Sequence, residues 1–275
     1  MHLSTAEAVR QANEVLAILE SGTYVSAEGS RVELGQSLAD ARTRTVSFPP
    51  DKAPPTPAPT NCRSSFEVVE ATTLDVARRL VERNLRPVAL NFANACFPGG
   101  GFLGGALAQE ESLCRASGLF GCLVGDPMYA FHADRSDTLY TDYVIYSPDV
   151  PVFRGEDGAL LERSWSCSFL TSPAPFAPGY LAAHPEGHRD LEAAFTSRIA
   201  KVLTVAAHHG HEALVLGAWG CGAFGNDSHM VAREFRDALA GPFRGVFTHV
   251  SFAITDSTST RRHIGPFEAA LSDLS

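Results

Sequence analysis

The sequence predicts an α/β protein with ligand-binding loops at the ends of its strands. Three observations carry this prediction. The β-like run SFEVVE, the helical segment LDVARRLVERN and the apolar run PVALNF together predict a βαβ unit. A glycine-rich loop follows PVALNF, and a second series of strand, glycine-rich loop and helix begins at Ala213. Because open α/β sheets bind ligands at the carboxyl ends of their strands, both loops lie where a binding site is expected.

The first part of the chain is predicted to be an accessory segment, residues 1–60, which packs on the main domain, residues 61–275, within one globular unit. Residues 5–20 have the apolar periodicity of a helix, and GTYVSAEGSRVELG predicts two short strands around Glu28 and Gly29. Four prolines in DKAPPTPAPTN exclude regular structure. We therefore expect a surface loop there, which we favour over a partner-binding segment.

The helices of the main domain have recognisable ends. Thr72 and Asp75 predict a capping box at the start of the first helix. Residues 189–209 form the clearest helix of the chain, and Gly210 ends it. Ser228 is the predicted N-cap of the helix that follows the second glycine-rich loop.

Two further β-like runs are predicted to lead toward the site, and a third, predicted to be structural, closes the chain. YTDYVIYSPDVPVFRG and WSCSFLTSPAPFAPG end in proline and aromatic residues, which suits strands that lead into pocket walls. Val150, Phe153 and Phe176 are candidate wall residues, although core or loop packing is the favoured role for each. GVFTHVSFAITDS closes the chain as a strand, and Asp256 and Ser257 fall at its end, where they can reach the site.

Composition and charge exclude several classes of protein. With 275 residues, of which 45% are hydrophobic, the chain is long enough for a substantial core. Its start lacks a basic segment followed by a continuous apolar run, and no later segment has the roughly 20 apolar residues of a membrane span. We expect a cytoplasmic monomer without membrane contact. The 31 Asp and Glu residues outnumber 22 Lys and Arg residues, for a net charge of −9, which disfavours direct nucleic-acid binding.

No metal, cofactor or disulfide is expected. The six cysteines form neither a CxxC pair nor a zinc spacing, which is typical of reduced, buried thiols. Cys96 and Cys221 lie in the two glycine-rich loops, but neither has an evident base partner, so a nucleophilic cysteine is disfavoured. His208, His209 and His211 lie at a helix end without nearby carboxylates, and the helix dipole explains them more simply than a metal does.

The stretch NFANACFPGGGFLGGALAQEE combines a strand end at Asn94, a glycine loop and two adjacent carboxylates. Glycines allow the backbone N–H groups of the loop to approach a ligand where a side chain would collide. The helix after the loop begins with Gln109, Glu110 and Glu111, and its dipole favours carboxylates there. Adjacent residues on a helix point roughly 100° apart, so the two glutamates are not expected to face each other across one bond. Ordinary N-terminal charge is the alternative, which the glycines at this spacing disfavour.

The second glycine-rich loop, GAWGCGAFGN, follows the apolar run at residues 213–216 and precedes a helix. A strand, a glycine loop and a helix N-terminus together form an anion cradle. One glycine loop is a weak signal, but two at strand ends of the same chain strengthen each other. Phe224 stands among glycines, where it has little core role, and this favours stacking on a ligand ring.

Both loops resemble those of a known family. GGGFLGGALAQEE matches the pattern GGG, six to eight residues, then QEE, and resembles the signature of poly(ADP-ribose) glycohydrolases of the bacterial type. GAWGCGAFGN is similar to the diphosphate loop of that family, GxxGCGAFxN. The resemblance extends from about Pro87 to the last strand and, more weakly, over the N-terminal segment. It implies a macrodomain-like three-layer α/β/α sandwich with a central mixed sheet and an N-terminal helical extension.

The resemblance also implies an activity, hydrolysis of the ribose–ribose O-glycosidic bonds of poly(ADP-ribose). Glu111 is then the acid that protonates the leaving 2′-oxygen and activates water, and Glu110 holds ribose hydroxyls. Such an acid needs a raised pKa at neutral pH, which a dry pocket and a second carboxylate favour. The implied substrate-binding residues are Asn94, Gly99, Gly100, Gly101, Gln109, Gly220, Cys221, Gly222, Ala223, Phe224, Gly225 and Asn226.

The implied partners are poly(ADP-ribose) or ADP-ribosylated proteins as substrate and ADP-ribose as product, in the DNA damage response. The acidic composition offers no basic stripe for a long polyanion, so we expect ADP-ribose to be released mainly from chain ends. Two alternatives stay open, a macrodomain that only reads ADP-ribose and a mono-ADP-ribosyl hydrolase. A reader has no need of adjacent glutamates at the loop.

Overall fold

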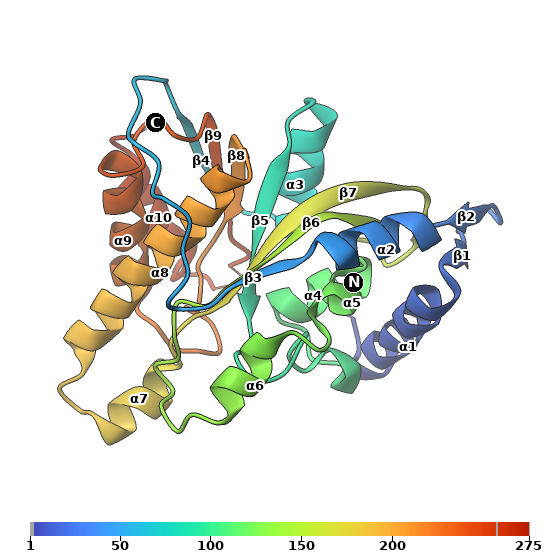
Figure 1. The fold of residues 1–275 in the computed structure, drawn as a ribbon, viewed down its shortest axis with the longest axis horizontal. Helices are drawn as coiled ribbons and strands as arrows, with labels where there is room; N and C mark the ends of the chain where they lie inside the picture. Colours follow the sequence, from blue (N-terminus) through green and yellow to red (C-terminus); the bar gives the residue numbers. More distant parts are fainter. Residues whose placement is uncertain (1–2, 257, 275) are drawn as a thin grey trace.

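The computed structural model describes residues 3–256 and 258–274. Within these residues a seven-stranded sheet has the order β3-β6-β7-β5-β8-β9-β4. The neighbours from β7 to β4 are parallel, whereas β6 pairs antiparallel with both β7 and β3. The mixed α/β sheet predicted from the sequence is therefore confirmed (Figure 1).

The bounds of the elements are as follows. The strands are β1 (Thr23–Val25), β2 (Arg31–Glu33), β3 (Val46–Phe48), β4 (Ser65–Val69), β5 (Pro87–Ala93), β6 (Val144–Arg154), β7 (Leu160–Pro173), β8 (Ala213–Leu216) and β9 (His249–Ala253). The helices are α1 (Thr5–Ser21), α2 (Gly35–Arg44), α3 (Thr73–Glu82), η1 (Phe102–Gly104), α4 (Gln109–Ala116), α5 (Leu119–Leu123), α6 (Pro127–Ala133), α7 (Ala177–Ala183), α8 (His188–His208), α9 (Ser228–Ala240) and α10 (Ile264–Leu271).

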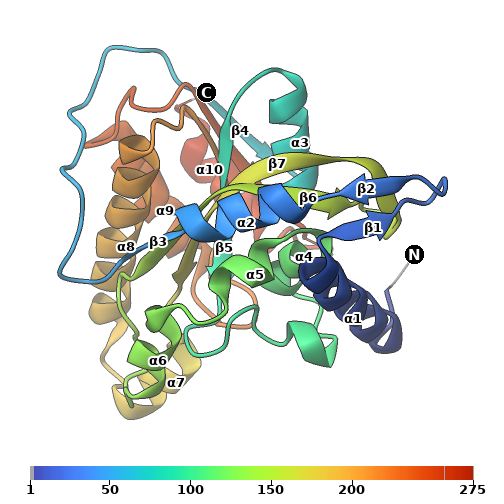
Figure 2. The ribbon, with the colours of Figure 1, turned by 45° about the vertical axis from the view of Figure 1, so that its right-hand side comes forward.

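Helices cover both faces of the sheet, as Figures 1 and 2 show. Apolar residues of α8, α9 and α10 form one core with one face, and those of α1 to α6 form a second core with the other. Side chains alternate along β5, so that Val88 and Leu90 enter the first core while Ala89 and Ala93 enter the second. Asn91 has the parity of Ala89 and therefore faces α4, whose first turn carries the two glutamates.

The predicted βαβ unit is present, but its strands are not neighbours. Strands β4 and β5 are parallel members of one sheet, with β8 and β9 between them. Helix α3 covers the crossover on the face of the second core. Local periodicity predicted the three elements, whereas the insertion of two later strands depends on contacts far apart in the sequence.

The N-terminal segment is joined to the main sheet by a strand. Strands β1 and β2 form the predicted pair around Glu28 and Gly29, and β3 pairs with β6 at the sheet edge. Residues 52–60 have neither helix nor strand, which confirms the loop expected from the prolines. The expected boundary at residue 60 thus falls after a strand that the segment contributes to the sheet.

The helix N-caps predicted from the sequence are confirmed in part. The Asp75 N–H donates to Thr72 Oγ1 at 3.2 Å, so the predicted cap is confirmed, but the Asp75 carboxylate pairs with Arg79 rather than completing a capping box. The predicted N-cap Ser228 is wrong by one residue. Asp227 accepts the His229 N–H at 2.9 Å and caps α9 instead.

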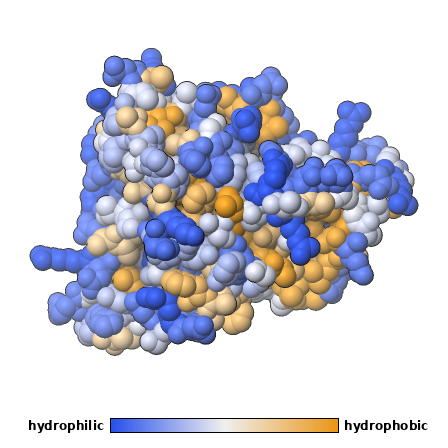
Figure 3. Space-filling view, in the orientation of Figure 1, coloured by the Kyte–Doolittle hydropathy of each residue, from blue (hydrophilic) through white to orange (hydrophobic). Residues whose placement is uncertain are grey.

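The outer face of the second core carries an apolar surface over α5 and the adjacent part of α1 (Figure 3). Leu16 of α1 and Val124, which follows α5, are exposed apolar residues, and Leu19 of α1 lies against Gly121 of α5. Among the described helices, none is both long and apolar enough for a bilayer span.

Candidate active site

A cleft of about 1330 Å³ extends from the start of α4 to the second glycine-rich loop, and the predicted binding glycines Gly99, Gly100 and Gly101 do not line it. One part of its wall comes from Asn94, Glu110 and Glu111, and another from Gly220 and residues 222–224 of the second glycine-rich loop. It lies where β5, β8 and β9 end, at the position expected for ligand binding in an open α/β sheet. The cleft continues past α4 to α1 and to the turn between β6 and β7.

Glu111 is held in the cleft by one oxygen only. The Gly101 N–H donates to Glu111 Oε1 at 2.8 Å. The other oxygen, Oε2, is buried and has no hydrogen-bond partner, and the residue is only 7% exposed. An unpaired buried carboxylate oxygen costs free energy, so its presence indicates a functional role. No protein group therefore competes with a ligand for this oxygen.

Glu110 is more deeply buried, at 3% exposure. Its Oε2 accepts the Asn94 N–H at 2.7 Å, and its Oε1 accepts the Asn91 side-chain amide at 3.3 Å. Burial raises the pKa of Glu110 to about 8, and the nearby Glu111 charge adds to this although the N–H donors oppose it. Glu110 is therefore mainly protonated at pH 7. The sequence led us to expect a raised pKa at the proposed acid Glu111, whereas the raised pKa that the structure indicates belongs to its neighbour Glu110.

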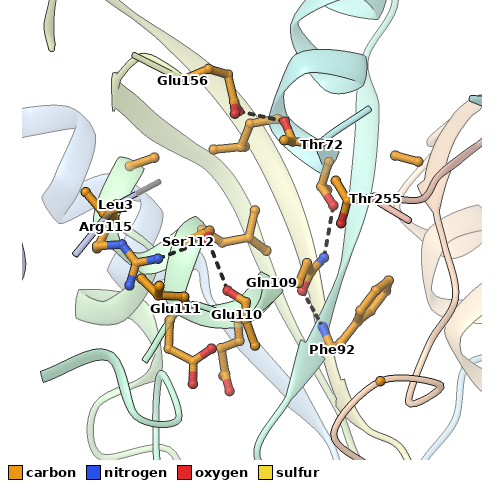
Figure 4. Close-up of a pocket in the computed structure, with 18 of the residues that line it drawn as sticks. Leu3, Thr72, Phe92, Gln109, Glu110, Glu111, Ser112, Arg115, Glu156 and Thr255 are labelled. Carbon is orange, nitrogen blue, oxygen red and sulfur yellow. Dashed lines mark hydrogen bonds between the residues drawn. The ribbon is translucent and has the colours of Figure 1, made fainter. Parts of the chain in front are cut away.

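The two carboxyl groups come together at Gly100. A Cβ on this residue would lie 2.5 Å from Glu111 Oε1 and 3.0 Å from Glu110 Oε2, and its φ is +58°. Figure 4 shows both side chains pointing the same way from the first turn of α4. The two carboxyl groups thus lie side by side, and they do not face each other from opposite sides of a substrate bond, as expected from the sequence. The space that glycine provides at residue 100 is used by the protein's own carboxyl groups.

Asn94 shapes the glycine loop. Its Oδ1 accepts the backbone N–H groups of Cys96 and Phe97, both at 2.9 Å. This Asx turn fixes the path of the backbone immediately before the glycines. The role of Asn94 as a substrate-binding residue stays a prediction, and Asn94 does line the cleft.

Gln109 connects α4 to β5. Its Oε1 accepts the Phe92 N–H at 2.9 Å, and its Nε2 donates to Leu90 O at 2.7 Å and to Thr73 Oγ1 at 3.1 Å. These bonds, drawn in part in Figure 4, use both ends of the amide within the protein. The glutamine of the QEE sequence thus sets the position of the two glutamates beside it.

The second glycine-rich loop is braced from behind by Asn226. Its Nδ2 donates to Pro175 O at 2.8 Å and to Gly220 O at 2.9 Å. Gly222 has open space around its Cα, and Ala223 is exposed. Of the loop residues predicted to bind substrate, Gly220, Gly222, Ala223 and Phe224 line the cleft, whereas Cys221, Gly225 and Asn226 do not.

Phe224 is half-buried on the cleft wall. Its ring lies 5.7 Å from that of Phe176 at an interplanar angle of 69°, an edge-to-face contact. Phe176 therefore has the packing role favoured for it, against Phe224. Val150 and Phe153 are fully buried core residues and do not line the cleft, so the core-packing role favoured for them is confirmed.

The properties of Cys96 and Cys221 do not support a nucleophilic role for either thiol. Cys221 is buried, and burial raises its pKa to about 12. Burial likewise raises the pKa of Cys96. A thiol with a raised pKa has little thiolate at neutral pH. Over the described part of the chain, no cluster of three or more His, Cys, Asp or Glu residues is placed to hold a metal ion.

Comparisons with known proteins identify the family of this chain. The family model described as "Microbial-type PARG, catalytic domain" matches residues 12–155. A crystal structure of poly(ADP-ribose) glycohydrolase (PARG) from Thermomonospora curvata is 41% identical, with a TM-score of 0.91, over 96% of this chain and 99% of that chain. The chain belongs to the microbial-type poly(ADP-ribose) glycohydrolase family. Among curated proteins, none matches it significantly.

Two further glycohydrolase structures carry ligands. The Thermomonospora curvata enzyme bound to the inhibitor ADP-HPD is 42% identical, with a TM-score of 0.87, over 96% of this chain and 99% of that one. The Deinococcus radiodurans enzyme in complex with ADP-ribose is 41% identical, with a TM-score of 0.84, over 89% of this chain and 100% of that one. The macrodomain-like α/β fold predicted for this glycohydrolase chain is thereby confirmed.

Sequence reasoning missed several walls of the glycohydrolase cleft. They come from α1, from residues 71–74, from the turn at residues 155–159 and from residues 253–255. Of these segments, only residues 253–255 could have been predicted from the sequence, because they lie at the end of the closing strand, where ligands bind in α/β sheets. Asp256, expected near the site, instead accepts the His263 and Ile264 N–H groups at the start of α10. Ser257 lies outside the described residues.

Proposed function

We propose that this protein hydrolyses the ribose–ribose O-glycosidic bonds of poly(ADP-ribose) and releases ADP-ribose. One observation carries the proposal. The Glu110–Glu111 pair lies in a cleft that also contains a glycine loop at the N-terminus of α9, a place suited to a diphosphate. The ADP-ribose and ADP-HPD complexes of its relatives support the same class of ligand.

The geometry supports separate roles for the two glutamates. Glu111, through its unpaired Oε2, donates a proton to the leaving 2′-oxygen as the bond from that oxygen to the anomeric carbon breaks. A water molecule adds to the oxocarbenium-like ribose and returns a proton to Glu111. Glu110 is mainly protonated at pH 7 and donates a hydrogen bond to a ribose hydroxyl. Because the carboxyl groups lie side by side, this scheme differs from that of glycosidases with two opposed carboxylates.

Cleavage mainly at chain ends belongs to the same proposal. The net charge of −9 and the anion cradle that the second glycine-rich loop forms in the cleft favour binding of one terminal unit over binding along the polymer. The expectations of a cytoplasmic monomer with a role in the DNA damage response also belong to it.

The test is the identity of the products formed from purified poly(ADP-ribose), measured by chromatography with mass detection. The wild type should release free ADP-ribose, and Glu111→Gln should release none while still binding ADP-ribose. Longer oligomers from the wild type would contradict cleavage at chain ends. Intact polymer with retained ADP-ribose binding would favour a reader, and release of ADP-ribose from singly modified proteins alone would favour a mono-ADP-ribosyl hydrolase.

A further inference from the structure

We propose that Arg154 and Arg115 form a positioning frame through which the N-terminal helix α1 holds α4 and the first glycine loop in their working geometry. The inference rests on the proposed function, because the group that the frame positions is Glu111. Neither arginine is a catalytic residue in this proposal.

Arg154 connects three parts of the chain. Its side chain is 4% exposed and stands at the end of β6. Its Nη2 pairs with Glu14 Oε2 of α1 at 2.8 Å, its Nη1 donates to Gly158 O at 3.0 Å, and its Nε donates to Arg115 O at 2.9 Å. The last contact places a cation at the C-terminal end of α4, where unpaired carbonyls and the helix dipole favour one.

Arg115 extends the frame along α4 to the loop. Its Nη2 donates to Ser112 Oγ at 3.0 Å, and its Nη1 donates at 2.6 Å to the carbonyl of Ala106, which lies between η1 and α4. Among the described residues no carboxylate lies within ion-pair distance of Arg115. Burial lowers its pKa, and the charge of Glu111, one turn away, opposes that shift. A buried guanidinium without an ion-pair partner is costly, so its retention needs a function.

The path from Arg115 to Glu111 is short. The Ala106 N–H donates to Gly101 O at 3.2 Å, and the Gly101 N–H in turn donates to Glu111 Oε1 at 2.8 Å. A shift of the Ala106 carbonyl would therefore move the donor that holds the catalytic acid.

Helix α1 also contacts the loop directly. A Cβ on Gly105 would lie 2.7 Å from Thr5 O and 2.9 Å from Val9 Cγ2, so the backbones meet where no side chain fits. Figure 2 shows α1 beside α4 on the same side of the sheet. The accessory helix thus holds one end of the loop by packing and the C-terminal end of α4 through Glu14 and Arg154.

Variants that disrupt the frame should lose turnover without losing ligand binding, because displacement of a catalytic group by about 1 Å costs on the order of 100-fold in rate. The variants are Glu14→Gln, Arg154→Lys and Arg115→Lys. Glu20→Gln, an exposed acid on the same helix, is the matched control. The readouts are kcat and KM on poly(ADP-ribose), the Kd of ADP-ribose by calorimetry, and thermal unfolding.

We expect kcat to fall about threefold in Glu14→Gln and about tenfold or more in both arginine variants, with KM and Kd within about twofold of wild type. Combining Glu14→Gln with Arg154→Lys should add little to the loss of Arg154→Lys alone, because both act through one contact. Glu20→Gln should match the wild type.

Unchanged kcat in folded Arg154→Lys and Arg115→Lys proteins would overturn the frame, as would a parallel loss of ADP-ribose binding. If the arginine variants do not fold, the kcat of Glu14→Gln tests the frame. This variant should fold, because the Glu14 side chain is half-exposed and Arg154 keeps its hydrogen bonds to two carbonyls. Intact polymer with the wild type contradicts the proposed function, whereas an active wild type with unchanged variants contradicts the frame alone.

Discussion

Gly100 lies so close to Glu111 that a Cβ on Gly100 would be 2.5 Å from Glu111 Oε1. The same Cβ would crowd Glu110 Oε2, and the φ of +58° is itself unfavourable for other residues. Residue 100 is therefore glycine because two carboxyl groups occupy the place of its side chain. The loop and the start of α4 act as one unit.

Gly100→Ala should reduce kcat on poly(ADP-ribose) by about 100-fold, because the methyl group must displace the catalytic carboxyl. Gly104→Ala is the matched control in the same loop, since its Cβ would meet no atom within 4 Å. Steady-state kinetics of the two variants checks this. Equal activities would show that the loop yields to the methyl group without moving Glu111.

Glu110→Gln should keep activity within about tenfold of wild type at pH 7, because an amide resembles the neutral carboxyl that burial produces there. Glu111→Gln should lose about 1000-fold or more, as expected for removal of a general acid. Initial rates of ADP-ribose release compare the two. If folded Glu110→Gln is as inactive as Glu111→Gln, a proton of Glu110 takes part in the reaction and the assignment of the acid changes.

Glu110 should also make folding stability depend on pH. Its pKa is raised from 4.5 to about 8 in the folded protein, so its contribution is fully present below pH 4.5 and is lost as the pH rises through 8. The loss amounts to at most about 5 kcal/mol in the free energy of unfolding. Urea unfolding of wild type and Glu110→Gln, at about pH 5 and about pH 8.5, measures the effect. Relative to wild type, the variant should gain stability at the higher pH; a constant difference would refute the raised pKa.

Phe224→Ala should weaken ADP-ribose binding by about tenfold, because stacking of a base on an aromatic ring contributes about 1–3 kcal/mol. Phe131→Ala is a control at an aromatic residue that does not line the cleft. Calorimetry gives both Kd values. An unchanged Kd in Phe224→Ala would show that no ring of the ligand stacks on Phe224 and would leave Phe224 as a packing partner of Phe176.

The sequence by itself determined the elements and the two loops. Helical and strand periodicities are local, so α1, α3, α8 and the strand before Asn94 could be assigned from residues close together in the chain. The sequences GGGFLGGALAQEE and GAWGCGAFGN were sufficient to indicate the family, because glycines that admit close contacts and carboxylates at a helix start are specified by the chain itself.

Tertiary structure alone decided how these parts act together. The order of the strands, the convergence of Glu110 and Glu111 on Gly100, and the use of both ends of the Gln109 amide depend on contacts that no local pattern records. The raised pKa of Glu110 arises from burial, which only the packed structure defines. The frame from Glu14 through Arg154 to Arg115 joins residues 140 and 39 positions apart, and its physical basis is the pairing of buried donors with acceptors that folding brings together.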